Sequence, residues 1–296
     1  MTERLLIFLY KLLSLIIKPL SYRGRRRLAR LISTLWWHLD PRRRKIALSN
    51  LNLVYGDTKS QEKKEQIAKA SFLSVSDTLV DFIRREKLEA DEIKQSFIIT
   101  GSDVIHDALS QDRKIICITP HFGNWELTSI AYALTFGPIS VVARPLDVAA
   151  LEELFKRNRE RFGVEVISKF GAMRGMVKAI SSGRAIGLLI DQSVDRYDGV
   201  VVNFLGVRSY QTPAAALLAL KNDALVVPVF CSYQEDGRYI VDFRRPIDAV
   251  AYKKNPDPIL SLAQAQADAL SEGICANPGA WMWMHNRWKH RPDLKE

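Results

Sequence analysis

The stretch KIICITPHFGNWELTSIAYAL, residues 114–134, decides the fold assignment. Its first part, 114–119, is a short apolar run rich in β-branched residues, which predicts a buried strand. Its last part, 125–134, reads as a helix. His121 lies between the two, so we expect it in a strand-to-helix turn, at the edge of the sheet where open α/β proteins bind ligands.

The same alternation of short β-rich runs with helical stretches continues through the chain. Strands are expected at 114–119, 139–144, 164–168, 185–191, 200–204, 224–231 and 239–243. Helices are expected at 125–134, 151–161, 172–182, 213–221 and 258–276, and also within 60–97, beside the sheet. This order predicts an α/β fold, an αβα sandwich with a mostly parallel central sheet.

The positive charge of the chain lies at its N-terminus. Residues 1–50 contain twelve Lys and Arg against two acids, which equals the whole net charge of +10, while the other residues carry 31 basic and 31 acidic side chains. A cationic segment followed by a neutral body predicts residues 1–50 as membrane-anchoring helices and 51–296 as the domain that carries the chemistry.

The apolar run 5–17 has the character of an interfacial helix. At ~1.5 Å per residue it spans about 20 Å, short of the roughly 30 Å hydrocarbon core of a bilayer. A seven-residue spacing puts Arg4, Lys11 and Lys18, within and beside this run, on one stripe. The residues expected to face anionic lipid are Arg4, Lys11, Lys18, Arg25, Arg26 and Arg27. For this N-terminal segment, a buried amphipathic core helix is the second interpretation and nucleic-acid binding is the third. A signal peptide is not supported, because the segment has no cleavage site.

His121 and Glu126 form the candidate catalytic pair. Five residues apart, they would point about 140° away from each other on a regular helix, so they can meet only if His121 precedes the helix. Gly123 permits the bend. Glu126 would then accept a hydrogen bond from one imidazole nitrogen and leave the other as a general base. The spacing alone is close to chance, and a structural histidine is the alternative.

The whole string His121-Phe122-Gly123-Asn124-Trp125-Glu126 resembles the H-x4-D/E motif of the lysophospholipid acyltransferase superfamily, in the form found in lipid A biosynthesis (lauroyl/myristoyl) acyltransferases. The resemblance covers about residues 100–292. Further blocks are similar to the family's in the same order: 142–147 (VARPLD), 171–175 (GAMRG), 191–193 (DQS), 204–213 (FLGVRSYQTP), 227–229 (VPV) and 281–289 (WMWMHNRWK).

The resemblance implies direct transfer of a fatty acyl chain from a thioester, on acyl-carrier protein or coenzyme A, to a hydroxyl of a membrane lipid, with no cofactor and no metal. His121 would be the base and Glu126 its partner, with the oxyanion held by backbone N–H groups of the turn and of the helix N-terminus, and by Arg144. Predicted substrate-binding residues are Arg144, Arg174, Asp191, Asn124 and Thr212.

Three of these interpretations have alternatives. Asp191 is as consistent with a strand-end cap as with a role in orienting Arg144 or the acceptor. Arg174 is at least as consistent with a solvated side chain as with a phosphate ligand. The tryptophans of 281–288 fit either a head-group rim or core packing.

Other chemistries lose support. The chain has no G-x-S-x-G elbow, phosphate-binding loop, G-x-G-x-x-G fingerprint or H-E-x-x-H site, and its three cysteines indicate a reducing compartment. We expect an enzyme on the cytoplasmic face of a bacterial inner membrane that acylates a lipid A precursor. A phosphatidylinositol mannoside, lysophospholipid or aminolipid acceptor is the alternative, as is a non-catalytic lipid-binding protein.

Overall fold

The computed structural model describes residues 3–143 and 149–292, and its central sheet has eight strands. In spatial order they are β1 (Phe97–Thr100), β9 (Tyr239–Phe243), β8 (Leu225–Tyr233), β2 (Ile115–Thr119), β5 (Ala185–Leu189), β3 (Ile139–Ala143) and β4 (Val164–Ser168), with β10 (Ile247–Asp248) also paired to β8. The five strands from β8 to β4 are parallel, whereas β9 and β1 run the opposite way. The predicted α/β class and mostly parallel sheet are confirmed.

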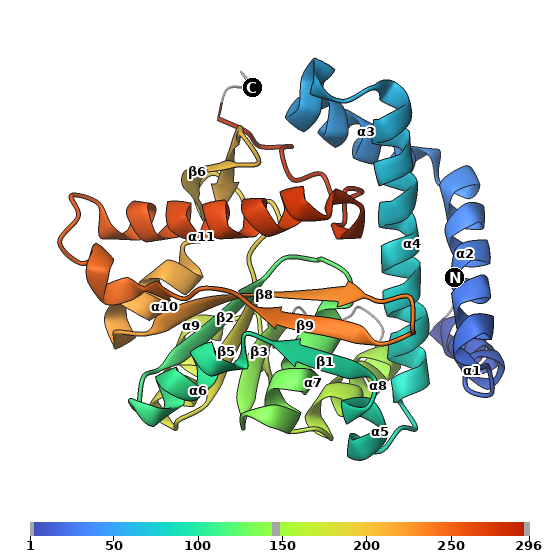
Figure 1. Cartoon of the computed structure of the whole chain (residues 1–296), viewed down its shortest axis with the longest axis horizontal. Coiled ribbons are helices and arrows are strands. Elements are labelled where there is room, and N and C mark those ends of the chain that lie inside the picture. Colours follow the sequence, from blue (N-terminus) through green and yellow to red (C-terminus); the bar gives the residue numbers. More distant parts are fainter. Residues whose placement is uncertain (1–2, 144–148, 293–296) are drawn as a thin grey trace.

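Helices cover both faces of the sheet (Figure 1). One face carries α5 (Ala90–Lys94), α6 (Ser102–Ser110), α7 (Trp125–Thr135) and α8 (Ala149–Glu160). The other carries α9 (Ala172–Ser181), α10 (Ala214–Asn222) and α11 (Pro258–Ala276). β2 alternates between the two cores, Ile116 and Ile118 facing one and Ile115 and Cys117 the other, and all five of its residues are buried. A strand covered on both faces reads as a continuous apolar run, which is why the sequence revealed β2.

Four helices precede the sheet: α1 (Glu3–Ile17), α2 (Tyr22–Leu39), α3 (Pro41–Tyr55) and α4 (Gln61–Arg85). In Figure 1, α4 stands across the end of the sheet toward which β8 points, and α2 lies along its outer side. Among the described residues no helix is long and apolar enough to cross a membrane. The predicted boundary at residue 50 falls inside α3, where the amide of buried Asn50 donates to the carbonyls of Trp283 and His285.

Two details of the predicted architecture need correction. The strand predicted at 200–204 is outside the central sheet: β6 (Val200–Phe204) pairs only with β7 (Val207–Gln211) in a separate hairpin. Leu205 and Gly206 have positive φ, as a tight two-residue hairpin turn requires. The predicted strand 185–191 stops at Leu189, which leaves Asp191 beyond the sheet edge. Short 3-10 helices occupy Gly56–Thr58, Ala249–Tyr252 and Pro278–Ala280.

The N-terminal cations divide into two groups. Lys18 and Arg26 form ion pairs with Glu86 and Asp77 of the α4 region, and the Arg25 guanidinium donates to the carbonyl of Leu20. For Lys18 and Arg26 the predicted contact with lipid is therefore corrected to docking of α1 and α2 on the body, whereas the bond of Arg25 stays within the N-terminal segment. Lys11 and Arg27 are exposed, and Arg4 lies in α1.

Candidate active site

His121 lies directly beyond the carboxyl end of β2, and its imidazole binds the carboxylate of Asp191. The ring Nδ1 is 2.8 Å from Asp191 Oδ1, and the His121 backbone N–H donates to Asp191 Oδ2 over 2.9 Å. Asp191 follows β5, the parallel neighbour of β2, so both residues leave the sheet at the same edge. The topology therefore creates the pair from residues seventy positions apart.

The Asp191 carboxylate is buried and is acceptor to three donors, the third being the indole N–H of Trp281 at 2.8 Å. Burial alone would raise the pKa of Asp191, but the His121 imidazole and these hydrogen bonds outweigh it and lower the pKa to about 2. An ionised carboxylate only accepts, so Nδ1 of His121 must carry the proton. That tautomer leaves Nε2 with its lone pair, as a general base requires.

Glu126 does not have the partner predicted for it. Its carboxylate binds the guanidinium of Arg159 in α8 through two hydrogen bonds of 3.0 and 2.9 Å. Burial raises the pKa of Glu126, but the charge and hydrogen bonds of Arg159, together with the charges of Arg85 and His121, outweigh it and lower the pKa below its usual value, so the carboxylate is ionised. This half-buried carboxylate in the first turn of α7 is matched by a cation with two parallel donors, Arg159. The predicted His121–Glu126 hydrogen bond is thus corrected to His121–Asp191 and Arg159–Glu126.

The turn that carries His121 is held from behind by α4. The Thr78 hydroxyl donates to the Gly123 carbonyl over 2.7 Å, and the Asn124 amide donates to the buried carboxylate of Asp81 over 2.7 Å. Gly123 has φ +52° and approaches β8 so closely that a Cβ would lie 1.7 Å from the carbonyl oxygen of Cys231. Asn124, predicted to bind substrate, is 1% exposed and positions the turn instead.

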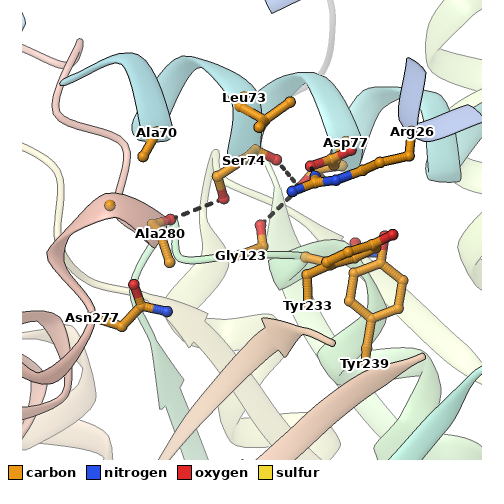
Figure 2. Close-up of a pocket in the computed structure, with 13 residues that line it drawn as sticks. Arg26, Ala70, Leu73, Ser74, Asp77, Gly123, Tyr233, Tyr239, Asn277 and Ala280 are labelled. Atoms are coloured by element: carbon orange, nitrogen blue, oxygen red, sulfur yellow. Dashed lines mark hydrogen bonds and ion pairs between the residues drawn. The ribbon is translucent and has the colours of Figure 1, made fainter. Parts of the chain in front are cut away.

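A cavity of about 200 Å³ lies behind this turn, with α4 on one side and Gly123, Tyr233 and Ala280 on the other (Figure 2). Arg26 of α2 reaches across it to Asp77 of α4, with its guanidinium 4.3 Å above the ring of Tyr233. Gly123 forms part of its floor. The N-terminal helices and the catalytic turn therefore share α4 as their support.

The backbone N–H groups of the turn are all engaged within the protein. His121 donates to Asp191, Phe122 to the carbonyl of Pro120, Gly123 to that of Ala280, and Asn124 to that of Cys231. The turn's share of the predicted oxyanion hole is therefore corrected, because an N–H already bound to a protein acceptor cannot serve a transition state as well. The N–H groups at the start of α7 and Arg144 stay a prediction.

The main cavity opens beside His121 and has a volume of about 620 Å³, within the range of ligand pockets. Its polar lining residues include Glu126, Arg159, Lys169 and Gln192, of which Gln192 contacts the His121 ring. The walls along the sheet and α7 are mostly apolar: Cys117, Tyr132, Ile139, Val141, Val142, Gly187, Leu188, Leu189, Ile190, Val229 and Phe243. The cavity thus joins polar side chains, His121 among them, to a mostly apolar wall.

The remaining predicted site residues are placed as follows. Thr212 lines the cavity, and its hydroxyl accepts a hydrogen bond from the Ala214 N–H at the start of α10. Arg174 is exposed on α9 and is not among the cavity-lining residues. Arg144 lies outside the described residues.

The C-terminal tryptophan segment is packing and support, not a head-group rim. Trp281 and Trp283 are buried and in edge contact. The buried guanidinium of Arg287 donates to the carbonyls of Gln192 and Tyr210, and His285 Nε2 accepts from the Ser193 N–H over 3.0 Å. Burial lowers the pKa of His285 to about 4, which keeps it neutral as this hydrogen bond requires. The segment thus fixes the peptide group that joins Gln192 to Ser193.

A histidine oriented by a buried carboxylate beside a cavity with mostly apolar walls is an arrangement suited to general-base chemistry in an α/β enzyme. The chain belongs to the bacterial lipid A biosynthesis acyltransferase family, whose match extends over residues 1–290.

Several characterised relatives are similar to the chain. The Escherichia coli lipid A biosynthesis lauroyltransferase is 25% identical over 257 residues, 85% of this chain and 81% of the relative. The Haemophilus influenzae lipid A biosynthesis acyltransferase is 26% identical over 257 residues, covering 86% and 80%. A phosphatidylinositol mannoside acyltransferase of Mycobacterium tuberculosis is 25% identical over 195 residues, 64% of this chain, and the match spans only 60% of that relative's length.

A solved structure, the 1-acyl-sn-glycerophosphate acyltransferase of Thermotoga maritima, covers 86% of this chain and 99% of its own, at 13% identity and a TM-score of 0.38. That likeness is too distant to support an argument.

Proposed function

We propose that the protein transfers a fatty acyl chain from a thioester donor, acyl-carrier protein or coenzyme A, to a hydroxyl group of a membrane lipid, a lipid A precursor. The observation that carries the proposal is the free Nε2 of His121 at the mouth of an apolar cavity, with Nδ1 bound to Asp191. Family membership supports the same reaction class.

His121 Nε2 removes the proton from the acceptor hydroxyl as its oxygen attacks the thioester carbonyl carbon. The ionised Asp191 stabilises the imidazolium that forms. When the tetrahedral intermediate collapses, the carbon–sulfur bond breaks and the imidazolium returns its proton to the departing thiolate. Acyl transfer is direct, and no acyl-enzyme forms.

The aliphatic chain of the donor occupies the apolar part of the cavity. Burial of each methylene contributes about 0.8 kcal/mol, so a long chain anchors the thioester beside His121 without polar contacts. Glu126 and Arg159 lie at the polar end, where their fixed ion pair borders the reacting groups.

A phosphatidylinositol mannoside is the second candidate acceptor, supported by the similarity to the mycobacterial relative. Mass spectrometry of total lipids from cells lacking the gene distinguishes the acceptors. A lipid A species lighter by one acyl chain supports the first proposal, and a phosphatidylinositol mannoside lighter by one chain supports the second. A lipid profile identical to that of the parent strain would contradict both.

We place the protein on the cytoplasmic face of the bacterial inner membrane, bound through α1 and α2. Leu31, Leu35 and Leu39 form an exposed stripe on α2, 56%, 50% and 78% exposed, and Phe8 and Leu15 of α1 are 61% and 72% exposed. Exposed cations flank them, namely Lys11, Arg23, Arg27 and Arg30. Apolar side chains beside cations fit an anionic bilayer surface.

Vesicle sedimentation tests this membrane surface. Changing both Leu31 and Leu35 to Glu removes about 3 kcal/mol of apolar burial, which predicts a partition coefficient lower by roughly 100-fold on phosphatidylglycerol vesicles. Leu109→Glu, at a 45% exposed leucine on α6, is the matched control and should leave binding unchanged. Equal losses in both variants would argue against a specific surface on α2.

A further inference from the structure

Gln192 lies directly against the catalytic nitrogen of His121. Its side-chain Nε2 is 3.2 Å from His121 Nε2, and the residue lines the main cavity. The backbone beneath it is fixed, because its carbonyl accepts from Arg287 over 2.7 Å and the next N–H donates to His285. The side chain is exposed and free to turn while its attachment point stays in place.

The direction of this contact follows from Asp191. With Nδ1 donating to the carboxylate, Nε2 of the neutral imidazole can only accept, so the amide group of Gln192 is the donor. The amide therefore occupies the position that the acceptor hydroxyl must take when it approaches the base. Binding of the hydroxyl displaces the amide but leaves it next to the reacting atoms.

The reaction also needs a donor for the oxyanion. The four backbone N–H groups of residues 121–124 are bound to protein acceptors, and the guanidinium of Arg159 is bound to Glu126. Gln192 is the cavity-lining amide that already contacts the base and forms a weak, replaceable hydrogen bond there.

We propose that Gln192 is a catalytic residue whose amide moves from His121 Nε2 to the thioester carbonyl and donates a hydrogen bond to the oxyanion of the tetrahedral intermediate. This rests on the proposed acyl transfer. As the hydroxyl oxygen bonds to the carbonyl carbon, its proton passes to His121 Nε2 and the π electrons of the carbonyl move to its oxygen. The Gln192 amide donates a hydrogen bond to the oxyanion that forms. When the intermediate collapses, that oxygen becomes a carbonyl again, the thiolate leaves with the proton from His121, and Gln192 can return to the base.

Steady-state kinetics of Gln192→Met and Gln192→Glu tests the proposal. Methionine keeps the length without a donor, and glutamate keeps the shape but only accepts. Loss of an oxyanion donor lowers kcat by about 10²–10³, so both variants should fall by that factor, with KM for the thioester within about threefold of wild type. Because the side chain is exposed, the melting temperature should not change. Gln111→Met, at an exposed glutamine after α6, is the control and should retain full kcat.

Two results would overturn the role of Gln192. If Gln192→Met keeps or gains kcat, the side chain only covers the resting base. If KM rises while kcat is unchanged, Gln192 binds substrate and does not act on the transition state. Either result leaves acyl transfer by the wild-type protein intact, whereas absence of any transfer by wild type would instead contradict the proposed function.

Discussion

Replacing Asp191 with asparagine tests the assignment of the partner of His121. Two donors, the His121 backbone N–H and the Trp281 indole, point at Oδ2 and need an acceptor there. The amide oxygen of the substituted side chain must take that position, which places its NH2 group opposite Nδ1 of His121. Nδ1 then becomes the acceptor and the ring proton moves to Nε2, so the base loses its lone pair.

The expected loss can be estimated from this change of tautomer. The equivalent substitution in the serine-protease triad, where geometry is kept but the tautomer is wrong, lowers kcat by about 10⁴. We expect Asp191→Asn to lose about 10³–10⁴ in kcat, or roughly 4–5.5 kcal/mol of transition-state stabilisation. The fold should be retained, because the volume and two of the three hydrogen bonds are kept.

The assay measures product formation by purified protein in detergent micelles, with a radiolabelled thioester and the lipid acceptor. Glu126→Gln is the comparison: it weakens the bidentate pair with Arg159 but leaves His121 and Asp191 untouched, so we expect a smaller loss. Circular dichroism checks that both variants fold. The reasoning is refuted if Asp191→Asn retains activity within about tenfold of wild type while Glu126→Gln loses about 10³-fold.

Three further predictions concern other parts of the site. Thr78→Val leaves the Gly123 carbonyl without its hydrogen bond and should lower the free energy of unfolding by about 1–3 kcal/mol, whereas Thr78→Ser should remain near wild type. If Thr78→Val and Thr78→Ser are equally stable in denaturant titration, α4 does not support the turn through this hydrogen bond. Gly187→Val should shift donor preference to shorter acyl chains, because its Cβ would lie 3.1 Å from Val141 in the cavity wall. Displacing two methylenes of a long acyl chain loses about 1.6 kcal/mol of burial, which lowers kcat/KM for the long thioester roughly 15-fold. An unchanged chain-length preference would contradict the placement of the acyl chain along Gly187. Burial lowers the pKa of His285 to about 4, so between about pH 6.5 and 4 the unfolded chain takes up a proton that the folded protein does not. The free energy of unfolding should therefore fall as the pH drops through this range, by up to about 3 kcal/mol. Urea titration measures this pH dependence, and an equally steep fall in His285→Gln would rule the explanation out.

The fold was largely predictable because its signals are local. The apolar run of β2 and the segment of α7 gave the structural boundaries within one residue, and position 121 was placed correctly between them. The strand β6 was also predicted, but it was assigned to the central sheet and not to the hairpin with β7, because that pairing depends on the positive-φ turn between the two strands. Periodicity identifies a strand without identifying its neighbour.

The hydrogen-bond partners of His121 and Glu126 could not be found from local patterns. Asp191 meets His121 because β5 lies beside β2, and strand order is a property of the whole sheet. The available signal was that both residues follow apolar runs, which in a parallel sheet end at one edge. Arg159 and Thr78 carried no comparable signal, since a polar side chain on a helix is ordinarily solvated.

The charge of the N-terminal segment was predicted correctly, but its distribution in space was not. A count of cations cannot tell Arg27, which is exposed, from Arg26, which pairs with Asp77 and stacks on Tyr233. Adjacent positions on a helix point about 100° apart, so neighbours in a basic run face different surroundings.

The most direct measurement is the turnover of purified His121→Ala with the thioester and the lipid acceptor that wild type uses. Loss of general-base catalysis predicts a decrease in kcat of about 10²–10⁴, with the folded structure retained. Near-normal formation of the acylated lipid by folded His121→Ala would contradict the account.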